Sequence, residues 1–560
     1  MSSQTWQELA EDKRKRLAAL IPKDWLITPP PKDVLDVTRF PLECGLLSEK
    51  EVAITEEKDI GVLLTKLATG ELSSVEVTTA FAKRAIIAQQ TVNCLTEIFI
   101  DKALKRAAYL DEQLKKTGKP TGPLHGLPIS LKDQIRLTGL ETSMGYVSWL
   151  GKYEDKDAVL AELLVAAGAV PYVRTNVPQT LMWVETYNAI FGRTLNPYNR
   201  NLTSGGSSGG EGALIAMKGS PLGVGSDIGG SIRVPAAFCG LYGLRPSYNR
   251  VPYHGSANSL EGQDSLPSVL GPLSPSLSGI LAFMRAVVGQ EPWRKDPLAV
   301  RKPWNNDEYA LCEHGGRGGK LVFAFLWNDG VVVPHPPIIR AMEETKRALL
   351  AAGHEVVDWE PTGHKELVKV TNEIWTAAGE EDYRAVTSLT GEPLLISMET
   401  LDAAERAFTQ VPEKSISAFE LFQIHKRRLA LRKAYLDRWE ATAQVSSTGR
   451  PYDAIIAPVA PWASTPHGKN SSAAYTSVWN ALDYSACVFP VTHVDPAVDA
   501  KKPAHAFLSE RDEQTYNFYD PETWRGAPVG LHLVGRSYEE EAVIAMTEVV
   551  SEALKAAGVH

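Results

Sequence analysis

The chain has 560 residues, of which 44% are hydrophobic and 22% charged, as in an ordinary soluble globular protein. Its formal net charge of −9 argues against a nucleic-acid partner, because phosphate binding depends on clustered Lys and Arg side chains. The five cysteines are widely spaced and form no C-x-x-C pair, which argues against a disulfide framework and a cysteine zinc site and favours a cytoplasmic location.

The N-terminal segment, residues 1–55, is predicted to form a helical arm. Its apolar residues recur at helical spacing, and Thr5-x-x-Glu8 can form a capping box at the start of a helix. The first residues are too polar and charged for a secretory signal peptide. The longest apolar run, residues 158–170, is too short to span a bilayer and contains Glu162. The sequence therefore predicts no signal peptide and no membrane span.

From about residue 60, helical and strand-like segments alternate. The run "PISLKDQI" is a short apolar stretch with one lysine inside it. "AVLAELLVAAGAV" is typical of a helix, and "VPYVRT" of a short buried strand. "YDAIIAPVAP" and "GAPVGLHLVGR" are late strands that precede a helix at about 538–556. This alternation predicts an α/β fold whose mixed or parallel sheet is covered on both faces.

One zone departs from this alternation. Residues 360–445 are helix-rich and end in the basic amphipathic stretch "IHKRRLALRKAYLDRWEATA". Such a helix can lie on a membrane surface or against a partner, but a solvated helix face is the more common explanation. No long linker divides the chain. We therefore predict a single large domain over 56–560, with a helix-rich insertion around 360–445.

The most informative block is glycine-rich. Residues 201–245 contain twelve of the 43 glycines in the chain. No G-x-x-x-x-G-K-[ST] phosphate loop is present, and the dinucleotide motif G-x-G-x-x-G fails because Ile228 occupies its third glycine position. "HEVVD" begins like the zinc motif H-E-x-x-H but ends in Asp358. The sequence therefore predicts neither a nucleotide cofactor nor a metal site.

The run "GGSSGG" raises the possibility of a serine hydrolase. It matches the nucleophile elbow G-x-S-x-G twice, once around Ser207 and once around Ser208. An elbow enzyme also needs an acid and then a histidine downstream, and downstream histidines are present, so the pattern alone does not exclude it. Cys239 is another candidate nucleophile, but no base motif accompanies it, and a buried small side chain is the better interpretation.

A second serine turn follows in "SDIGGS", which ends in Ser231. The flexible residues before this serine can turn several amides toward one point, as an oxyanion hole requires. The amides concerned are those of Ile228, Gly229, Gly230 and Ser231 itself.

Three separated motifs then agree in order and spacing: "GPLHGLPISLKDQ", "GGSSGGEGALI" and "GSDIGGSIRVPAAFCGLYGLRPS". Together they resemble the amidase signature family, serine hydrolases with a Ser–Ser–Lys triad. The resemblance runs from about residue 60 to 555, and "ETSMGY" and "NALDYSACVFPVT" resemble the fungal acetamidase branch. It implies the amidase signature fold, with a central mixed, twisted β-sheet between helices. It also implies a cofactor-free amidase, with a homodimer suggested, that acts on small amides, with esters, carbamates or anilides as further candidate substrates.

The resemblance also implies a role for each matching residue. Ser231 is the nucleophile, Ser207 is the bridging serine and Lys132 is the base. The Gly206–Ser207 peptide bond is expected to be cis. The amidase reaction needs Lys132 to be neutral, although the free pKa of lysine is about 10.4. Burial in apolar surroundings lowers that pKa, and "LPISLKDQIRL" is apolar enough to be buried.

Other residues are expected to support this triad. Leu181 resembles the position whose carbonyl faces the leaving group, and Met182 and Trp183 are expected to line the acyl pocket, with core packing as the competing interpretation. Three further residues are expected to orient the triad, with plain loop stabilisation as an equally good explanation: Ser208, Asp227 and Arg233.

Two other functions stay open at this point. A glutamine-amidase subunit of a tRNA-dependent amidotransferase belongs to the same family, but it would need partner subunits and a pocket that recognises a carboxylate. A non-catalytic relative could serve as a scaffold, although the intact Lys132, Ser207 and Ser231 argue against it.

Overall fold

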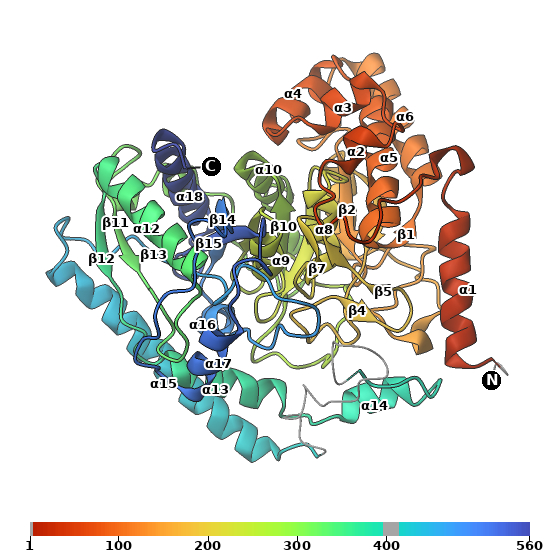
Figure 1. The fold of residues 1–560 in the computed structure, drawn as a ribbon. Coiled ribbons are helices and arrows are strands. Elements are labelled where there is room, and N and C mark those ends of the chain that lie inside the picture. Colours follow the sequence, from red (N-terminus) through yellow and green to blue (C-terminus); the bar gives the residue numbers. More distant parts are fainter. Residues whose placement is uncertain (1–3, 396–413, 560) are drawn as a thin grey trace.

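The computed structural model describes residues 4–395 and 414–559 (Figure 1). Its centre is an 11-stranded mixed sheet with the strand order β1-β3-β2-β8-β10-β9-β14-β15-β13-β11-β12. Strand β2 runs parallel to β3 and β8, and β11 runs parallel to β12 and β13, while the other neighbours are antiparallel. The predicted α/β fold with a mixed sheet is confirmed.

The strands of the large sheet are β1 (Leu95–Ile98), β2 (Pro128–Lys132), β3 (Val170–Thr175), β8 (Gly223–Asp227), β9 (Tyr242–Arg245), β10 (Val269–Ser274), β11 (Val322–Phe325), β12 (Glu355–Asp358), β13 (Ala454–Pro458), β14 (Ala486–His493) and β15 (Pro528–Val534). Two short ribbons pair β4 (Tyr187–Asn188) with β5 (Gly192–Arg193), and β6 (Leu195–Asn196) with β7 (Asn199–Thr203).

The helices are α1 (Trp6–Ala19), α2 (Phe40–Glu43), α3 (Glu49–Thr55), α4 (Ile60–Thr69), α5 (Ser74–Val92), α6 (Ile100–Thr117), α7 (Val159–Ala166), α8 (Gly209–Ala216), α9 (Arg233–Phe238), α10 (Leu277–Val288), α11 (Asn306–Tyr309), α12 (Pro336–Ala351), α13 (His364–Trp375), α14 (Glu381–Thr387), α15 (Ala418–Ala441), α16 (Ala474–Leu482), α17 (Glu510–Phe518) and α18 (Glu540–Ala556). None of these described helices is long and apolar enough to cross a membrane.

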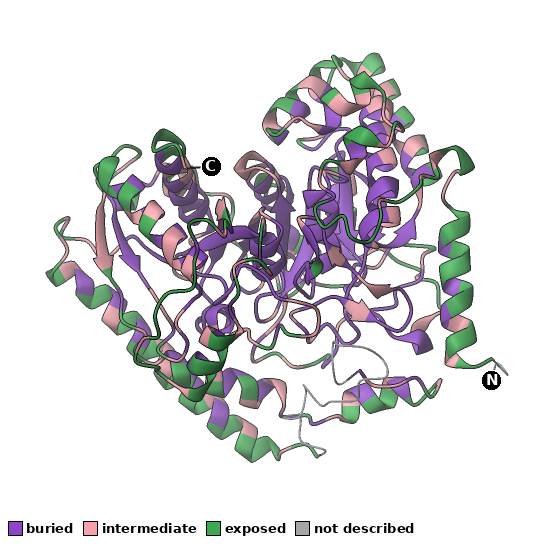
Figure 2. Cartoon of the chain, in the orientation of Figure 1, coloured by how far each residue is buried: buried purple, intermediate pink, exposed green. Residues whose placement is uncertain are grey.

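Successive side chains of strand β14 show that helices cover both faces of the sheet. Cys487 and Phe489 of β14 belong to the large hydrophobic core that also contains residues of α12 and α18. Val488, between them, belongs to a separate core with residues of α9. Because successive side chains of a strand point to opposite faces, this strand is buried on both sides. Figure 2 shows the buried residues concentrated in the sheet and in the helices against it.

Several elements follow the sequence predictions closely. The capping box between Thr5 and Glu8 is present at the start of α1. Helix α7 and strand β3 occupy the predicted run, and Lys132 is the last residue of β2. The late strands are β13 and β15, and the last predicted helix is α18. Helices α13, α14 and α15 fall in the predicted insertion, although its residues 396–413 lie outside the described residues. The division of the chain into an arm and one domain stays a prediction.

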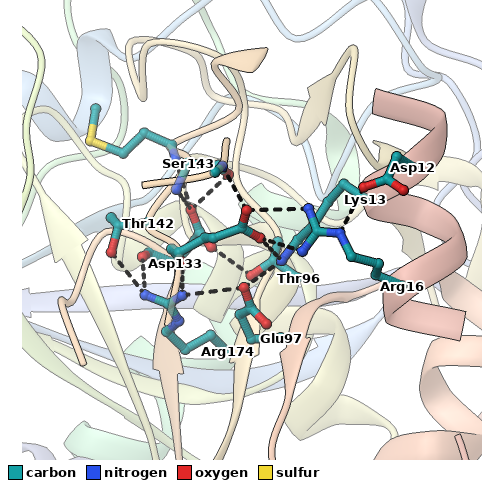
Figure 3. A network of polar contacts seen from close by, with 12 residues as sticks. Asp12, Lys13, Arg16, Thr96, Glu97, Asp133, Thr142, Ser143 and Arg174 are labelled. Carbon is teal, nitrogen blue, oxygen red and sulfur yellow. Dashed lines mark hydrogen bonds and ion pairs between the residues drawn. The ribbon is translucent and has the colours of Figure 1, made fainter. Parts of the chain in front are cut away.

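Buried charges fasten α1 to the edge of the sheet (Figure 3). The Lys13 side chain is only 4% exposed, and its Nζ lies 2.5 Å from Glu97 Oε1 on β1 and 2.8 Å from Glu141 Oε2. Arg16 adds an ion pair of 2.9 Å to Glu141. Fully buried Arg174 of β3 continues the network, because it lies 3.7 Å from Glu97 Oε1 and donates to the carbonyl of Asp133, the residue after Lys132, at 3.1 Å. The N-terminal helix is therefore linked to the end of β2.

Replacing Lys13 by Ala tests this link. We expect the free energy of unfolding to fall by about 3 kcal/mol, because two buried carboxylates lose a partner in a site that excludes water. The measurement is urea unfolding of the full-length protein, with thermal melting alongside. Lys15→Ala is the matched control: Lys15 pairs with Glu11 on the exposed side of the same helix, so its loss should change stability by less than about 0.5 kcal/mol. Equal stability of both variants would contradict the buried-anchor explanation.

Candidate active site

The topology of the sheet brings the three sequence motifs together. Strands β2 and β8 are parallel neighbours, with Leu131 opposite Val224, so their carboxyl ends meet at one edge. Lys132 ends β2, and the turn that contains Ser231 follows β8 directly. The third motif, with Ser207, forms the turn between β7 and α8. The three residues of the expected triad therefore come from segments that converge at one edge of the sheet.

Lys132 is completely buried, and its amine contacts two hydroxyl groups. Nζ lies 2.7 Å from Ser207 Oγ and 2.7 Å from Ser226 Oγ. Burial lowers the pKa of Lys132 to about 7, although the negative charges of Asp227 and Glu211 act to raise it. A substantial fraction of this lysine is therefore neutral near pH 7, and a neutral amine can accept a proton.

Glu211, at the start of α8, is a second buried ionisable group near the amine. It accepts hydrogen bonds from Ser130 Oγ at 2.6 Å and from Thr175 Oγ1 at 2.8 Å. Burial raises the pKa of this carboxyl to about 8, against the lowering effect of the two hydroxyl donors. The neutral acid is therefore well populated near pH 7, which weakens its pull on the lysine.

The turn that carries Ser207 is held tightly. The Gly206–Ser207 peptide bond is cis, as the family resemblance implies. A Cβ on Gly206 would lie 2.3 Å from the carbonyl oxygen of Glu185, so only glycine fits there. The amide of Ser208 donates to the carbonyl of Ser231 at 3.2 Å, which joins this turn to the turn after β8. The neighbour of the Ser207 hydroxyl is Lys132, which favours the Ser–Ser–Lys arrangement over a histidine elbow.

An ion pair shapes the second serine turn. Asp227 accepts the amides of Gly230 at 2.8 Å and Ile232 at 3.2 Å, and Arg233 contacts both of its carboxylate oxygens at 3.0 and 2.9 Å. Burial alone would raise the pKa of Asp227, but the charge and hydrogen bonds of Arg233 outweigh it and the net pKa is lowered. Asn480 of α16 adds a hydrogen bond of 2.9 Å. Asp227 therefore holds the turn as a carboxylate anion.

Gly230 shows why this turn needs glycine. Its φ is +139°, and a Cβ there would lie 2.3 Å from Thr476 Oγ1 of α16. Because its amide donates to Asp227, this amide already has an acceptor within the turn. Of the four amides in the predicted oxyanion hole, those of Ile228, Gly229 and Ser231 are therefore the stronger candidates.

Ser231 opens into a cavity of about 320 Å³. Five other residues predicted from the sequence line it as well: Leu181, Met182, Trp183, Ile228 and Gly229. The backbone beside them is unusual, since both Thr180 and Leu181 have positive φ values, 73° and 63°. Three other predicted residues are not among the residues that line the cavity, and they form hydrogen bonds that hold the turns beside it: Ser208, Asp227 and Arg233.

Sequence reasoning missed several residues around the site. Ser226 lies within a recognised motif, and its position before Asp227 was a usable signal. Trp375 lines the cavity from α13, in the helix-rich insertion, and carried no local signal. Cys239 is buried, with a raised pKa caused by that burial, so its thiolate is disfavoured. "HEVVD" contains strand β12 rather than a helix, and no cluster of three or more metal-ligating side chains occurs among the described residues.

Comparisons with known proteins identify the family of the chain. The amidase family model matches residues 76–544. The acetamidase of Emericella nidulans is 46% identical over 552 residues, covering 98% of each chain. The acetamidase of Aspergillus oryzae is 44% identical over 554 residues, covering 99% of this chain and 100% of the other. A solved fatty acid amide hydrolase superposes with a TM-score of 0.90 at 34% identity, covering 98% of this chain and 95% of the other. The chain therefore belongs to the amidase signature family and hydrolyses amides.

Proposed function

We propose that the chain hydrolyses small carboxylic amides to a carboxylate and ammonia or an amine through a Ser231 acyl-enzyme. The observation that supports this most strongly is the buried Lys132 amine, 2.7 Å from Ser207 Oγ, with a pKa lowered to about 7 by burial. A serine hydroxyl is a weak nucleophile until a base removes its proton. In this proposal neutral Lys132 is that base, and Ser207 relays the proton of Ser231 to it.

The proposed cycle moves one proton through two serines. Neutral Lys132 takes a proton from Ser207, which takes one from Ser231 as Ser231 Oγ bonds to the amide carbonyl carbon. The amides of Ile228, Gly229 and Ser231 stabilise the negative charge that develops on the carbonyl oxygen. The C–N bond then breaks, and Ser207 donates a proton to the departing nitrogen while Lys132 returns one to Ser207. Water hydrolyses the acyl-enzyme by the same path, and no cofactor is required.

The cavity suggests which acyl groups fit. Its apolar lining comes from Leu181, Met182, Trp183 and Trp375, and its volume of about 320 Å³ exceeds what an acetyl group needs. Leu181 is proposed to face the leaving group with its backbone carbonyl. We therefore propose that short aliphatic and aryl-substituted acyl groups both bind, with esters, carbamates and anilides as further substrates. The homodimer and the cytoplasmic location stay predictions from the sequence.

A covalent label tests the nucleophile. A fluorophosphonate probe should modify Ser231, as identified by peptide mapping, and Ser231→Ala should lose the label because the attacking oxygen is gone. The same preparation is assayed with acetamide, phenylacetamide and oleamide, and we expect the first two to be hydrolysed faster. A label on Ser207 or Ser208 would restore the elbow interpretation.

The same panel separates the alternatives. A glutamine-amidase subunit needs a group that binds the substrate carboxylate, and Arg511 at the cavity is a cation that could do so. Hydrolysis of glutamine without turnover of simple amides would favour that function. An absence of both label and turnover would favour the scaffold.

The pH dependence tests the lysine. Protonated Lys132 cannot accept the proton of Ser207, so kcat/KM should rise with pH and level off above about 7, where burial places the pKa of the amine. The measurement is kcat/KM for one amide between pH 5.5 and 9.5. A rate that falls steadily from pH 6 to 9 would contradict a neutral lysine base.

Removal of the amine gives an independent test. Lys132→Ala should lower kcat by about 10²–10⁴-fold, the range typical of a general base. Lys218→Ala is a suitable control, because Lys218 pairs with Glu56 at a part-exposed position away from the serines. Full activity of Lys132→Ala at pH 7 would rule out the lysine as the base.

A further inference from the structure

Two hydroxyl groups contact the Lys132 amine, and only one of them can face its lone pair. A neutral amine has one lone pair and two N–H groups, and two hydroxyls lie at the same distance, 2.7 Å, from Nζ. Lys132 can remove a proton from Ser207 only if its lone pair faces Ser207. If the lone pair instead accepted the O–H of Ser226, the base would be occupied by the wrong hydroxyl.

The neighbours of the Gln134 side-chain amide determine which way the amide faces. Gln134 is fully buried, and its Nε2 lies 2.8 Å from the carbonyl oxygen of Ala257 and 2.8 Å from the Tyr253 hydroxyl. A backbone carbonyl can only accept hydrogen bonds, so the NH₂ group must face Ala257. The flipped amide would place two acceptor oxygens 2.8 Å apart. The amide oxygen, Oε1, therefore faces Ser226, at 2.5 Å from Ser226 Oγ.

This orientation passes along the chain of hydrogen bonds. Because Gln134 Oε1 can only accept, Ser226 gives its single O–H proton to Gln134. The Ser226 oxygen is then left as an acceptor, and it receives an N–H from Lys132. With that N–H committed, the lone pair of the neutral amine is free to accept the O–H of Ser207.

We infer that Gln134 is a positioning residue which, through Ser226, aims the lone pair of Lys132 at Ser207. The inference rests on the proposed function, since it assumes that Lys132 is the base. Gln134 touches neither the amine nor the cavity, and its effect depends on the single proton of Ser226. The backbone carbonyl of Ala257 fixes the orientation of the Gln134 amide, and that orientation sets the direction of the hydrogen bonds that follow.

The test compares one single variant with one double variant. In Gln134→Met the Ser226 hydroxyl loses its acceptor and can turn its O–H to the lone pair of Lys132, so kcat should fall by about 10–100-fold with KM unchanged. Adding Ser226→Ala removes the competing hydroxyl. The double variant should therefore recover about tenfold in kcat over Gln134→Met. A double variant that is no more active than Gln134→Met would overturn the inference.

Two further variants serve as controls. Tyr253→Phe removes the other partner of Gln134 Nε2 but leaves Ala257, so kcat should stay within about twofold. Gln134→Glu, as the buried neutral acid, can still donate to Ala257 and accept from Ser226, so it should retain activity even where Gln134→Met fails to fold. A folded Gln134→Glu protein, verified by thermal melting, that loses as much kcat as Lys132→Ala would overturn the inference.

Lys132→Ala, measured in parallel, separates the two proposals. Full activity of that variant would remove the lysine base and the inference with it. An inactive Lys132→Ala beside a fully active Gln134→Met would leave the proposed function intact and refute the role of Gln134 alone.

Discussion

The proposed mechanism depends on one lysine amine being neutral inside the protein. Burial disfavours the ammonium form, but a buried amine still needs hydrogen-bond partners. Lys132 obtains two from uncharged hydroxyls, Ser207 and Ser226, each at 2.7 Å. A carboxylate in either place would favour the ammonium form of Lys132 and so remove the proposed base. The position of β2 between β3 and β8, inside a sheet covered on both faces, supplies the required burial.

Nearby carboxyl groups are arranged so that their effect on the pKa of this amine is small. Asp227 raises the pKa of Lys132, yet its own charge is compensated by Arg233 in a pair of fully buried side chains. Asp227 of this pair also accepts the amide of Gly230 and so shapes the turn that carries Ser231. Glu211 also acts on the lysine, but burial raises its pKa to about 8 and reduces its charge. One ion pair thus shapes the turn of the proposed nucleophile, Ser231, while its own two charges compensate each other beside the proposed base, Lys132.

The sequence could predict the parts of the site that are local. A short apolar run containing Lys132, and glycines around Ser207 and Ser231, are enough to indicate a buried base and two tight turns. Which backbone amides of the predicted oxyanion hole already have an acceptor depends on the three-dimensional geometry. The spacing of residues in the sequence could not reveal that the Gly230 amide donates to Asp227. Thr476, Asn480 and Trp375 reach the site through the packing of α16 and α13, more than 140 residues further along the chain, so no local pattern indicated them.

The turn after β2 combines these requirements in four residues. It is closed by the Ile135 amide, which donates to the Lys132 carbonyl at 2.9 Å, and both central side chains are anchored. Asp133 accepts Thr96 Oγ1 at 2.7 Å and the Met144 amide at 2.7 Å, while Gln134 binds Ser226 and Ala257. Asp133 therefore fixes the backbone that presents the amine, and Gln134 is proposed to fix the direction in which the amine accepts a proton. Because Arg174 joins the Asp133 carbonyl to the buried charges under α1, the N-terminal helix supports the same turn from outside.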